Sequence, residues 1–306
     1  MSPSSASLPP RQDQLNRAMQ AAAGEVESVL DMLLPKPMGP EAQLFEAMRY
    51  AALGGGKRLR PFLTIQCGRL FDVGAAQLRQ VAGAVECVHV YSLVHDDLPA
   101  MDNDDVRRGK PSVHKQFDEA TAILAGNALL TLAFQLLSRA DTHADPFVRC
   151  EMVTRLAAAA GGRGMIGGQM MDLRAGEYEH TIEAITRLQR LKTGALIAFS
   201  CEAGGLMAKA SPKAMHALNV YAHDLGLAFQ IADDLLDVEG NAERMGKAAR
   251  KDRAADKATF VEILGVERAR DQARRLADQA ARHLDMFDER ADLLRAVAEF
   301  AVARDH

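Results

Sequence analysis

The 306-residue sequence lacks Trp, and aromatic residues make up only 5% of it. It also has few β-branched residues and many Ala, a composition that disfavours sheets and favours helices. Nor does it have the basic excess that is typical of nucleic-acid-binding proteins, because its net charge is −4. These absences predict an all-α protein without a nucleic-acid partner, in which any anion site must be a local feature.

Cysteine is also scarce, and the four that occur lie far apart without a C-x-x-C pair. We interpret them as reduced core thiols of a cytoplasmic protein. Residues 1–10 are rich in Ser and Pro and have no apolar signal-peptide stretch, so we expect a disordered lead. The longest apolar run, 120–137, is interrupted by polar residues and barely has the length of a bilayer span. We therefore expect a core helix there and no membrane span.

Apolar residues recur with helical periodicity along nearly the whole chain. The predicted helices cover residues 11–33, 41–53, 59–71, 75–101, 116–139, 145–161, 181–206, 212–238, 257–283 and 288–303. Pro and Gly clusters separate them, and no convincing strand occurs between them. Because no long linker divides the chain, we expect a single domain over 11–306.

Two of these apolar helices carry clusters of carboxylates. The first cluster lies in His89–Asp102 (HVYSLVHDDLPAMD) and the second in Gln230–Asp237 (QIADDLLD). Unpaired carboxylates on buried faces are costly, and bound divalent cations would remove that cost. In the second cluster, Asp233 and Asp237 lie about 40° apart on one helix face. This arrangement is a good platform for Mg²⁺, which takes one or two carboxylates and completes its shell with phosphate and water.

The first cluster does not fit an ideal helix as simply. Asp96 and Asp102 are six residues apart and would point in opposed directions on a straight helix. Pro99 permits a bulge, and a bulge that absorbs two residues would return Asp102 to the face of Asp96. Without a bulge, Asp97 and Asp104 would share a face instead. We prefer the bulge.

Basic residues occur beside both clusters. The segment Gly54–Pro61 (GGGKRLRP) begins a helix, where backbone N–H groups, Lys57 and Arg60 can face one anion. The other basic residues near the clusters are Arg107, Arg108, Lys192, Lys247 and Lys257. Any one of them could be an ordinary surface charge, but their distribution around two carboxylate platforms favours phosphate binding.

Together these segments resemble the trans-prenyl diphosphate synthases, especially the bacterial farnesyl diphosphate synthases. The matching motifs are GGKRLRP at 55–61, HDDLPAMD at 95–102, RRGKP at 107–111, GGQxxDL at 167–173, KTG at 192–194 and FQIADDLLD at 229–237. They occur in the family's order and span about residues 40–265. The resemblance implies the isoprenoid synthase fold, a large helical bundle around a central cavity, and a homodimer.

The resemblance also implies an activity. Allylic diphosphates (dimethylallyl and geranyl) would ionise, condense with isopentenyl diphosphate and lose a proton to give farnesyl diphosphate. Geranyl or geranylgeranyl diphosphate is the alternative product. In this family about three Mg²⁺ ions assist the departure of diphosphate, and an apolar cavity keeps water from the cation.

The family's functional residues map onto this sequence as follows. Asp96, Asp102 and Asp233 would hold the metal ions, with Asp97 and Asp237 as orienting or water-mediated groups. Arg107, Lys192, Lys257 and, with a role left open, Lys247 would bind the allylic diphosphate. Lys57, Arg60, His89 and Arg108 would bind isopentenyl diphosphate without metal. Thr193 and Gln230 would lie beside the reacting carbon.

Product length should depend on the floor of the cavity. Tyr91 and Ser92 precede Asp96 by five and four residues, which places them about one to one and a half helical turns deeper. The family's farnesyl synthases have an aromatic residue at the fifth position, and Tyr91 would stop the growing chain. Alternatively, Tyr91 is an ordinary core aromatic.

The sequence departs from the family at Asn103 and Asn127, where acids are usual, and at 245–252, which is more basic and less glycine-rich. Three other functions remain open. A terpene cyclase would form product from an allylic substrate alone, and a metal phosphohydrolase using His95 and Asp96 would release phosphate without joining carbons. A non-catalytic helical partner subunit would be inactive by itself.

Overall fold

The computed structural model describes residues 10–177, 179, 181–248 and 259–303, excluding the side chains of 10, 11 and 239–248. Helices dominate this part of the chain, and its one sheet is a hairpin of the two-residue strands β1 (Val106–Arg107) and β2 (Lys110–Pro111). The all-α prediction is therefore confirmed.

The helices vary in length from a single turn to 37 residues. They are α1 (Pro10–Leu33), α2 (Ala42–Ala52), α3 (Leu59–Arg69), α4 (Ala75–Asp96), α5 (Val113–Gln116), α6 (Glu119–Ser138), α7 (Pro146–Ala160), α8 (Met165–Leu173), η1 (Ala175–Glu177), α9 (Ile182–Gln189), η2 (Arg190–Gly194), α10 (Ala195–Met207), α11 (Pro212–Ala248), α12 (Phe260–Leu264), α13 (Val266–His283), η3 (Asp285–Ala291) and α14 (Asp292–Ala303). The turn η2 is π-helical, whereas η1 and η3 are 3₁₀ helices.

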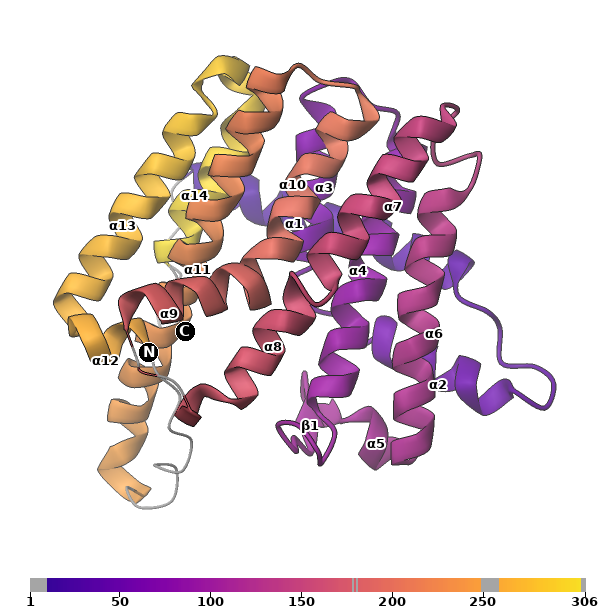
Figure 1. Ribbon diagram of the computed structural model, residues 1–306, viewed down its shortest axis with the longest axis horizontal. Coiled ribbons are helices and arrows are strands. Elements are labelled where there is room, and N and C mark those ends of the chain that lie inside the picture. Colours follow the sequence, from indigo (N-terminus) through magenta and orange to yellow (C-terminus); the bar gives the residue numbers. More distant parts are fainter. Residues whose placement is uncertain (1–9, 178, 180, 249–258, 304–306) are drawn as a thin grey trace, which may run out of the picture.

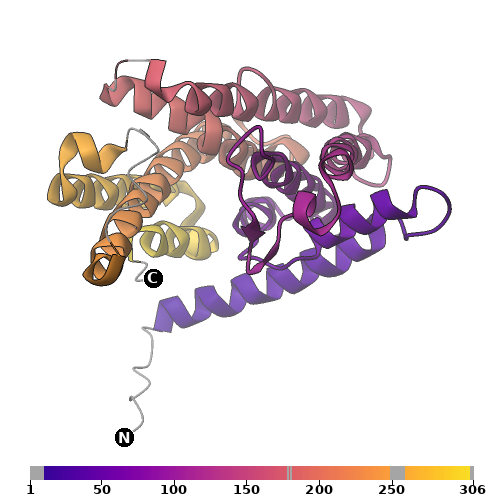
Figure 2. The same cartoon turned by 90° about the horizontal axis from the view of Figure 1, so that it is seen from below.

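The helices form a layered bundle. In Figure 1, α4 and α6 run side by side in one half of the molecule, and α11, α13 and α14 form the other half. The segment α8–α9 crosses in front of both halves. Figure 2 shows α1 along the opposite side of the bundle, so that α4 and α11 lie between these two covers.

Burial explains which helices are central. In α3, α4 and α10, long runs such as 61–68, 81–88 and 196–205 are buried continuously, as expected for helices surrounded by other helices. Helices α3 and α10 approach each other closely at Gly68 and Gly204, because a Cβ at Gly204 would overlap the backbone of Gly68. The small residues at this crossing therefore set the distance between two central helices.

Helix α6 has the length and apolar composition to cross a membrane, the one such helix among the described residues. Its side is packed against α4, and buried residues make up 44% of its most apolar window. Part of α6 is therefore buried within the bundle, as predicted for 120–137, and part of it is exposed.

Several predicted boundaries are wrong. The helix predicted over 75–101 ends at Asp96, and the one predicted over 181–206 is divided by the π-helical turn η2. Helix α8 was not predicted, since Gly167 and Gly168 lie within it and glycine disfavours helices. The hairpin was also missed. In the structure its two turn residues, Arg108 and Gly109, both have positive φ, as a two-residue type I′ turn requires. Pro10, assigned to the disordered lead, begins α1; residues 1–9 lie outside the described part.

Candidate active site

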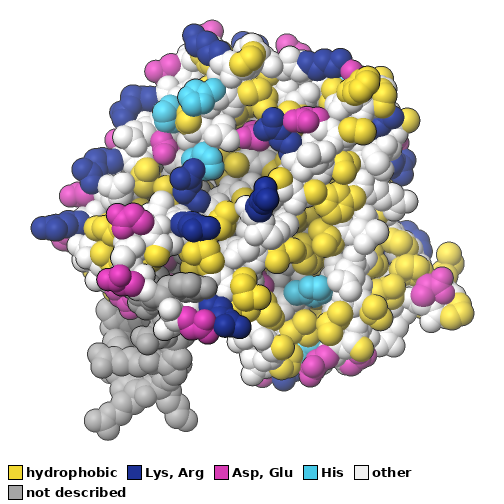
Figure 3. All heavy atoms as spheres, viewed as in Figure 1, with side chains coloured by type: hydrophobic (Ala, Val, Ile, Leu, Met, Phe, Trp, Pro, Cys, Tyr) yellow, Lys and Arg dark blue, Asp and Glu magenta, His cyan; other side chains and the backbone are white. Residues whose placement is uncertain are grey.

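A cavity of about 560 Å³ lies between α4, α6, α8 and η2. Its walls are mainly apolar and include Leu130 of α6 and Met170 of α8. Polar residues of the predicted site also line it, namely Arg60, His89, Ser92, Asp96, Lys192 and Thr193. Apolar side chains dominate the surface over α8 and the neighbouring part of α6, whereas charged ones gather over α9 and α13 (Figure 3). The cavity thus combines a few charged groups with a large apolar volume.

The first acidic motif lies where α4 ends. The chain leaves the helix after Asp96 and turns back, so that the backbone N–H of Asp102 donates to the Asp96 carbonyl oxygen at 2.8 Å. The predicted bulge within a continuing helix is therefore wrong in form, but the turn brings Asp102 to Asp96 as predicted. The pKa of Asp96 is raised to about 6, chiefly by burial; Lys192 lowers it, and the carboxylates of Asp102 and Asp97 raise it.

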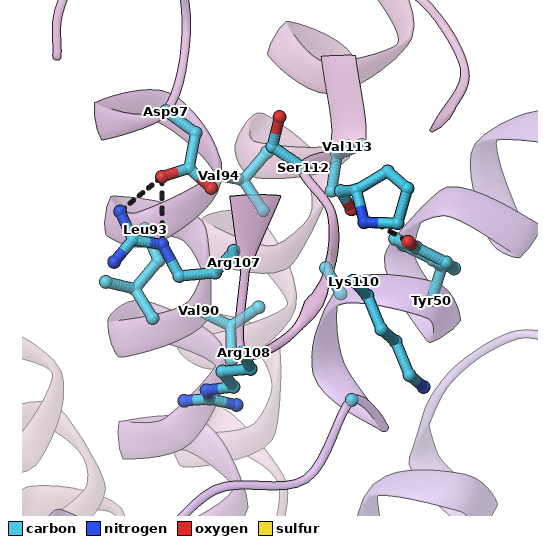
Figure 4. A pocket seen from close by; sticks show the side chains of 13 residues that line it. Tyr50, Val90, Leu93, Val94, Asp97, Arg107, Arg108, Lys110, Ser112 and Val113 are labelled. Carbon is cyan, nitrogen blue, oxygen red and sulfur yellow. Dashed lines mark hydrogen bonds and ion pairs between the residues drawn. The ribbon is translucent and has the colours of Figure 1, made fainter. Parts of the chain in front are cut away.

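Asp97 has a different environment from Asp96. It is buried, and the Nε of Arg107 donates to its Oδ1 at 2.9 Å (Figure 4). Arg107 also forms an ion pair of 2.9 Å with Asp104. Asp97 and Asp104, which were expected to share a helix face if no bulge formed, therefore both bind one guanidinium. Burial raises the pKa of Asp97, whereas the hydrogen bond to Asp97 raises the pKa of Arg107. Asp97 thus positions Arg107 and the hairpin that carries it.

Arg60 gives the cavity wall a positive charge, and His89 lines the cavity within electrostatic reach of it. The Nε of Arg60 is buried and has no hydrogen-bond partner among the described residues. Burial lowers the pKa of Arg60, and burial together with Arg60 and Arg108 lowers the pKa of His89 well below its usual value. A buried, unsatisfied cationic donor is costly, and a bound anion would satisfy it.

Arg108 and Lys57 lie near the glycine-rich segment. The guanidinium of Arg108 bonds the Gly55 carbonyl and lies directly over Gly56, where a Cβ would be 2.8 Å from its Cζ. Lys57 is exposed, with its Nζ 5.8 Å from the centre of the Phe300 ring. Two of the predicted isopentenyl diphosphate ligands thus meet at this loop.

Arg58, to which the sequence analysis gave no role, explains why the loop is fixed. It is 4% exposed, has a positive φ, and forms an ion pair with buried Glu86. Its guanidinium also bonds the Ala52 carbonyl at 2.6 Å, which ties the loop back to α2. The signal for this role was weak, since a single Arg between Lys57 and Arg60 reads as one more phosphate ligand.

Lys192 lies in the π-helical turn η2, a type of irregularity that often marks functional sites. Its Nζ forms an ion pair of 2.5 Å with Asp172 of α8. A Cβ at Gly168 would lie 2.6 Å from the Lys192 Cα, so Gly168 allows α8 to touch η2. Gln169, from the same motif, lines the cavity. The GGQxxDL motif therefore positions Lys192, a role that the sequence analysis did not assign to it.

The second acidic motif begins beside η2. The hydroxyl of Thr193 donates to the Gln230 Oε1 at 3.4 Å, and the Gln230 amide donates to Asp234 at 3.0 Å. Asp234 is buried and also accepts a hydrogen bond of 3.2 Å from the Phe260 N–H, which fixes the start of α12. Asp233 is exposed, and its charge partly opposes the lowering of the Arg60 pKa by burial. Asp233 thus lies within electrostatic reach of the cavity wall, whereas Asp234 is structural.

The remaining predicted residues are placed less completely. Tyr91 and Ser92 both line the cavity, and the Ser92 hydroxyl donates to the His89 carbonyl at 2.8 Å. Asp237 is exposed on α11, near enough for its charge to raise the pKa of Asp234. Lys247 lies in α11 but its side chain is outside the described residues, as is all of Lys257.

The carboxylates fit a divalent cation of the magnesium type. Among the described residues, no group of three or more His, Cys, Asp or Glu side chains forms a metal-ligand cluster. Mg²⁺ does not need one, because it usually takes one or two carboxylates and fills its shell with substrate phosphate and water. The ionised Asp96 and Asp102 are costly neighbours in the apo chain, and a bound cation would offset their repulsion.

The chain is similar to known proteins over nearly its whole length. The family model described as Polyprenyl synthetase matches residues 41–299. The farnesyl diphosphate synthase of Escherichia coli is 42% identical over 94% of this chain and 98% of its own length, and that of Geobacillus stearothermophilus is 42% identical over 95% and 97%. The crystal structure of an FPP/GFPP synthase from Zymomonas mobilis superposes with a TM-score of 0.87, at 48% identity over 95% of this chain and 100% of that one.

Proposed function

This chain belongs to the polyprenyl synthetase family, and on that premise we propose that it condenses dimethylallyl and geranyl diphosphates with isopentenyl diphosphate to make farnesyl diphosphate. The observation that carries the proposal is the cavity, with Asp96 and Lys192 among its polar groups and Tyr91 more than one helical turn deeper along α4. Its apolar walls suit an isoprenoid chain, and its charged groups suit two diphosphates. The bacterial relatives named above are called farnesyl diphosphate synthases.

Family membership implies a divalent cation, which we propose to be Mg²⁺, about three ions per site held by Asp96, Asp102 and Asp233. When bound, these ions would supply positive charge to the allylic diphosphate as it leaves. Lys192 and Arg107 would add to that charge, since both lie within electrostatic reach of Asp96. Asp97 and Asp237 would act indirectly, and Lys247 and Lys257 stay predictions from the sequence.

The rest of the reaction follows from the placement of the other groups. Arg60, His89, Arg108 and Lys57 would hold isopentenyl diphosphate, so that its double bond faces the allylic carbon. Thr193 lies in η2 and is bonded to Gln230, and the oxygen atoms of both side chains would stabilise the positive charge that develops on that carbon. The C–O bond of the allylic diphosphate would break first to leave an allylic cation, which the double bond of isopentenyl diphosphate would then attack. The proton lost in the final step would go to the departed diphosphate. Apolar residues such as Leu130 and Met170 would exclude water.

We also propose a cytoplasmic homodimer. Large apolar side chains are exposed on the adjacent helices α6 and α7, among them Ile123, Leu124 and the 83%-exposed Phe147. Exposed large apolar side chains of this kind are typical of an interface, and a second copy of the chain is the occupant that we propose. All four cysteines are free, which suits a reducing compartment.

The test is to incubate the purified chain with dimethylallyl and isopentenyl diphosphates and Mg²⁺ and to separate the dephosphorylated products by chromatography. We expect farnesol as the main product, and its loss when the divalent cation is chelated. Mainly C10 or C20 alcohols would indicate a geranyl or geranylgeranyl synthase instead. Product from the allylic substrate alone would indicate a terpene cyclase, phosphate release without C–C bonds a phosphohydrolase, and complete inactivity a partner subunit.

A further inference from the structure

Two aromatic rings of α4 are in contact within the cavity. Tyr91 and His95 are four residues apart and therefore lie on one face of the helix. Their rings meet edge to face, with 5.5 Å between centroids and an angle of 87° between planes. Both residues line the cavity, and Tyr91 is 6% exposed. The Tyr91 ring, expected at the cavity floor, is therefore in contact with a second ring of the cavity lining.

The His95 ring is fixed from the other side by α6. Its Nε2 lies 3.1 Å from the Ile123 carbonyl oxygen, and because a carbonyl only accepts, Nε2 carries the proton of this hydrogen bond. Gly126 makes room for the ring: a Cβ there would overlap the imidazole and lie 2.5 Å from its Cδ2. His95 therefore rests directly on the α6 backbone, at a place where any larger residue would push the ring away.

Tyr91, by contrast, is held by packing alone. Within the described part of the chain, no hydrogen bond restrains its hydroxyl, and burial raises its pKa to about 12, so the ring stays neutral. A buried aromatic without a polar anchor takes the orientation that its neighbours permit. The neighbour that meets the Tyr91 ring edge to face is His95.

We propose that His95, held by Gly126 and the Ile123 carbonyl, is the positioning residue that fixes the Tyr91 ring as the floor of the cavity and so sets product length. The proposal rests on the proposed prenyl transfer and deepens it. It assigns the limit on product length to three groups in contact that join α4 to α6, namely the Tyr91 ring, the His95 ring and the α6 backbone at Ile123 and Gly126. In this arrangement His95 acts through Tyr91. Changes at Tyr91 and at Gly126, the two neighbours of the His95 ring, should then alter product length in opposite directions.

Removing the ring should lower the floor. In His95→Ala, Tyr91 loses its edge-to-face partner and can turn into the vacated volume, so the share of products longer than C15 should rise about 2- to 10-fold, the range expected for one aromatic contact. Gly126→Ala should do the reverse, because the new methyl displaces the imidazole from α6 toward Tyr91 and the cavity. There the share of C10 product should rise. His216→Ala, an exposed site on α11, is the matched control and should leave the distribution unchanged.

The decisive readout is the double variant Tyr91→Ala/His95→Ala. If His95 acts through Tyr91, its product distribution should equal that of Tyr91→Ala alone, because nothing remains to be positioned. Additive lengthening in the double variant would overturn the proposal, as would an unchanged distribution in both His95→Ala and Gly126→Ala. Distributions are compared at equal total turnover in variants with wild-type circular dichroism, so a loss of rate or folding does not imitate the effect.

This inference and the proposed function fail separately. If wild type forms no C–C bond with Mg²⁺ and both substrates, the proposed function is wrong. If wild type makes farnesyl diphosphate and Tyr91→Ala lengthens it, but the changes at 95 and 126 do not alter length, only the role of His95 is wrong.

Discussion

At the scale of single residues, Asp96 shows a conflict between function and stability. Burial raises its pKa to about 6, so the folded chain holds this proton more tightly than the unfolded chain, in which Asp titrates near 4. Ionisation of Asp96 therefore costs stability, fully above about pH 6 and not at all below about pH 4. The carboxylate is retained at this cost because its charge is what the divalent cation requires.

We predict that Asp96→Asn stabilises the apo protein at pH 7.5 by roughly 1–3 kcal/mol and lowers kcat about 100-fold or more. Urea unfolding without divalent cations measures the first effect, which should shrink as the pH is lowered from 6 to 4. Asp271→Asn, at an exposed site on α13, is the control for both measurements. Reduced stability of Asp96→Asn at pH 7.5 would contradict the assignment.

Arg60 permits a second test at this scale. Its buried, unsatisfied Nε predicts that Arg60→Gln raises the KM for isopentenyl diphosphate by about 10- to 100-fold, the usual value of a charge-assisted hydrogen bond. The KM for geranyl diphosphate should change much less. Initial rates with each substrate varied in turn measure both constants, and Arg17→Gln on the exposed face of α1 serves as the control. An equal rise in both KM values would remove Arg60 from the isopentenyl site.

Residue types were predictable from the sequence, but their partners were not. Asp97 was expected to orient the metal site and Arg107 to bind diphosphate, and the structure shows them bonded to each other. The adjacent acids of the second motif also look alike in sequence, yet Asp234 is buried against the start of α12 and Asp233 is exposed. Such distinctions depend on segments 10 to 26 residues away, which periodicity does not reveal.

At the scale of helices, the sequence predicted long regular elements well and irregular ones poorly. The apolar repeat and the bounding Pro and Gly residues located α1, α3, α6 and α7 within a few residues. The end of α4 at Asp96 was missed because Pro99 is compatible with a kink as well as with a stop. The π-helical turn at Lys192 left no trace, since it adds one residue to a turn without changing composition.

The crossing of α3 and α10 gives the test at the scale of helices. Gly204→Ala places a methyl group against the Gly68 backbone and 2.7 Å from the Cys67 carbonyl carbon, and backbone atoms cannot move aside as a side chain can. We predict a loss of about 1–3 kcal/mol or more in the free energy of unfolding. Gly24→Ala on α1, with nothing within 4 Å of the new Cβ, should instead gain roughly 0.5–1 kcal/mol. Chemical denaturation compares the two; equal effects would contradict the close approach.

At the scale of the whole molecule, the proposed homodimer predicts a particle of twice 33.2 kDa in sedimentation equilibrium. Leu124→Glu puts a charge on the exposed apolar side of α6 and should shift the protein to monomers at micromolar concentration. Met32→Glu, which changes a 74%-exposed residue on α1, should leave the dimer intact. A wild-type monomer, or a dimer insensitive to Leu124→Glu, would place the interface elsewhere or remove it.

The central claim is that the acidic motifs of α4 and α11 act on one substrate from opposite sides of the cavity. A crystal structure of the protein with Mg²⁺ and a non-ionisable thio analogue of geranyl diphosphate measures this directly. The account predicts that metal ions join Asp96 and Asp102 on one side, and Asp233 on the other, to a single diphosphate, with the geranyl tail directed toward Tyr91. A diphosphate contacted through only one of the two motifs, or a tail directed away from the cavity floor, would contradict it.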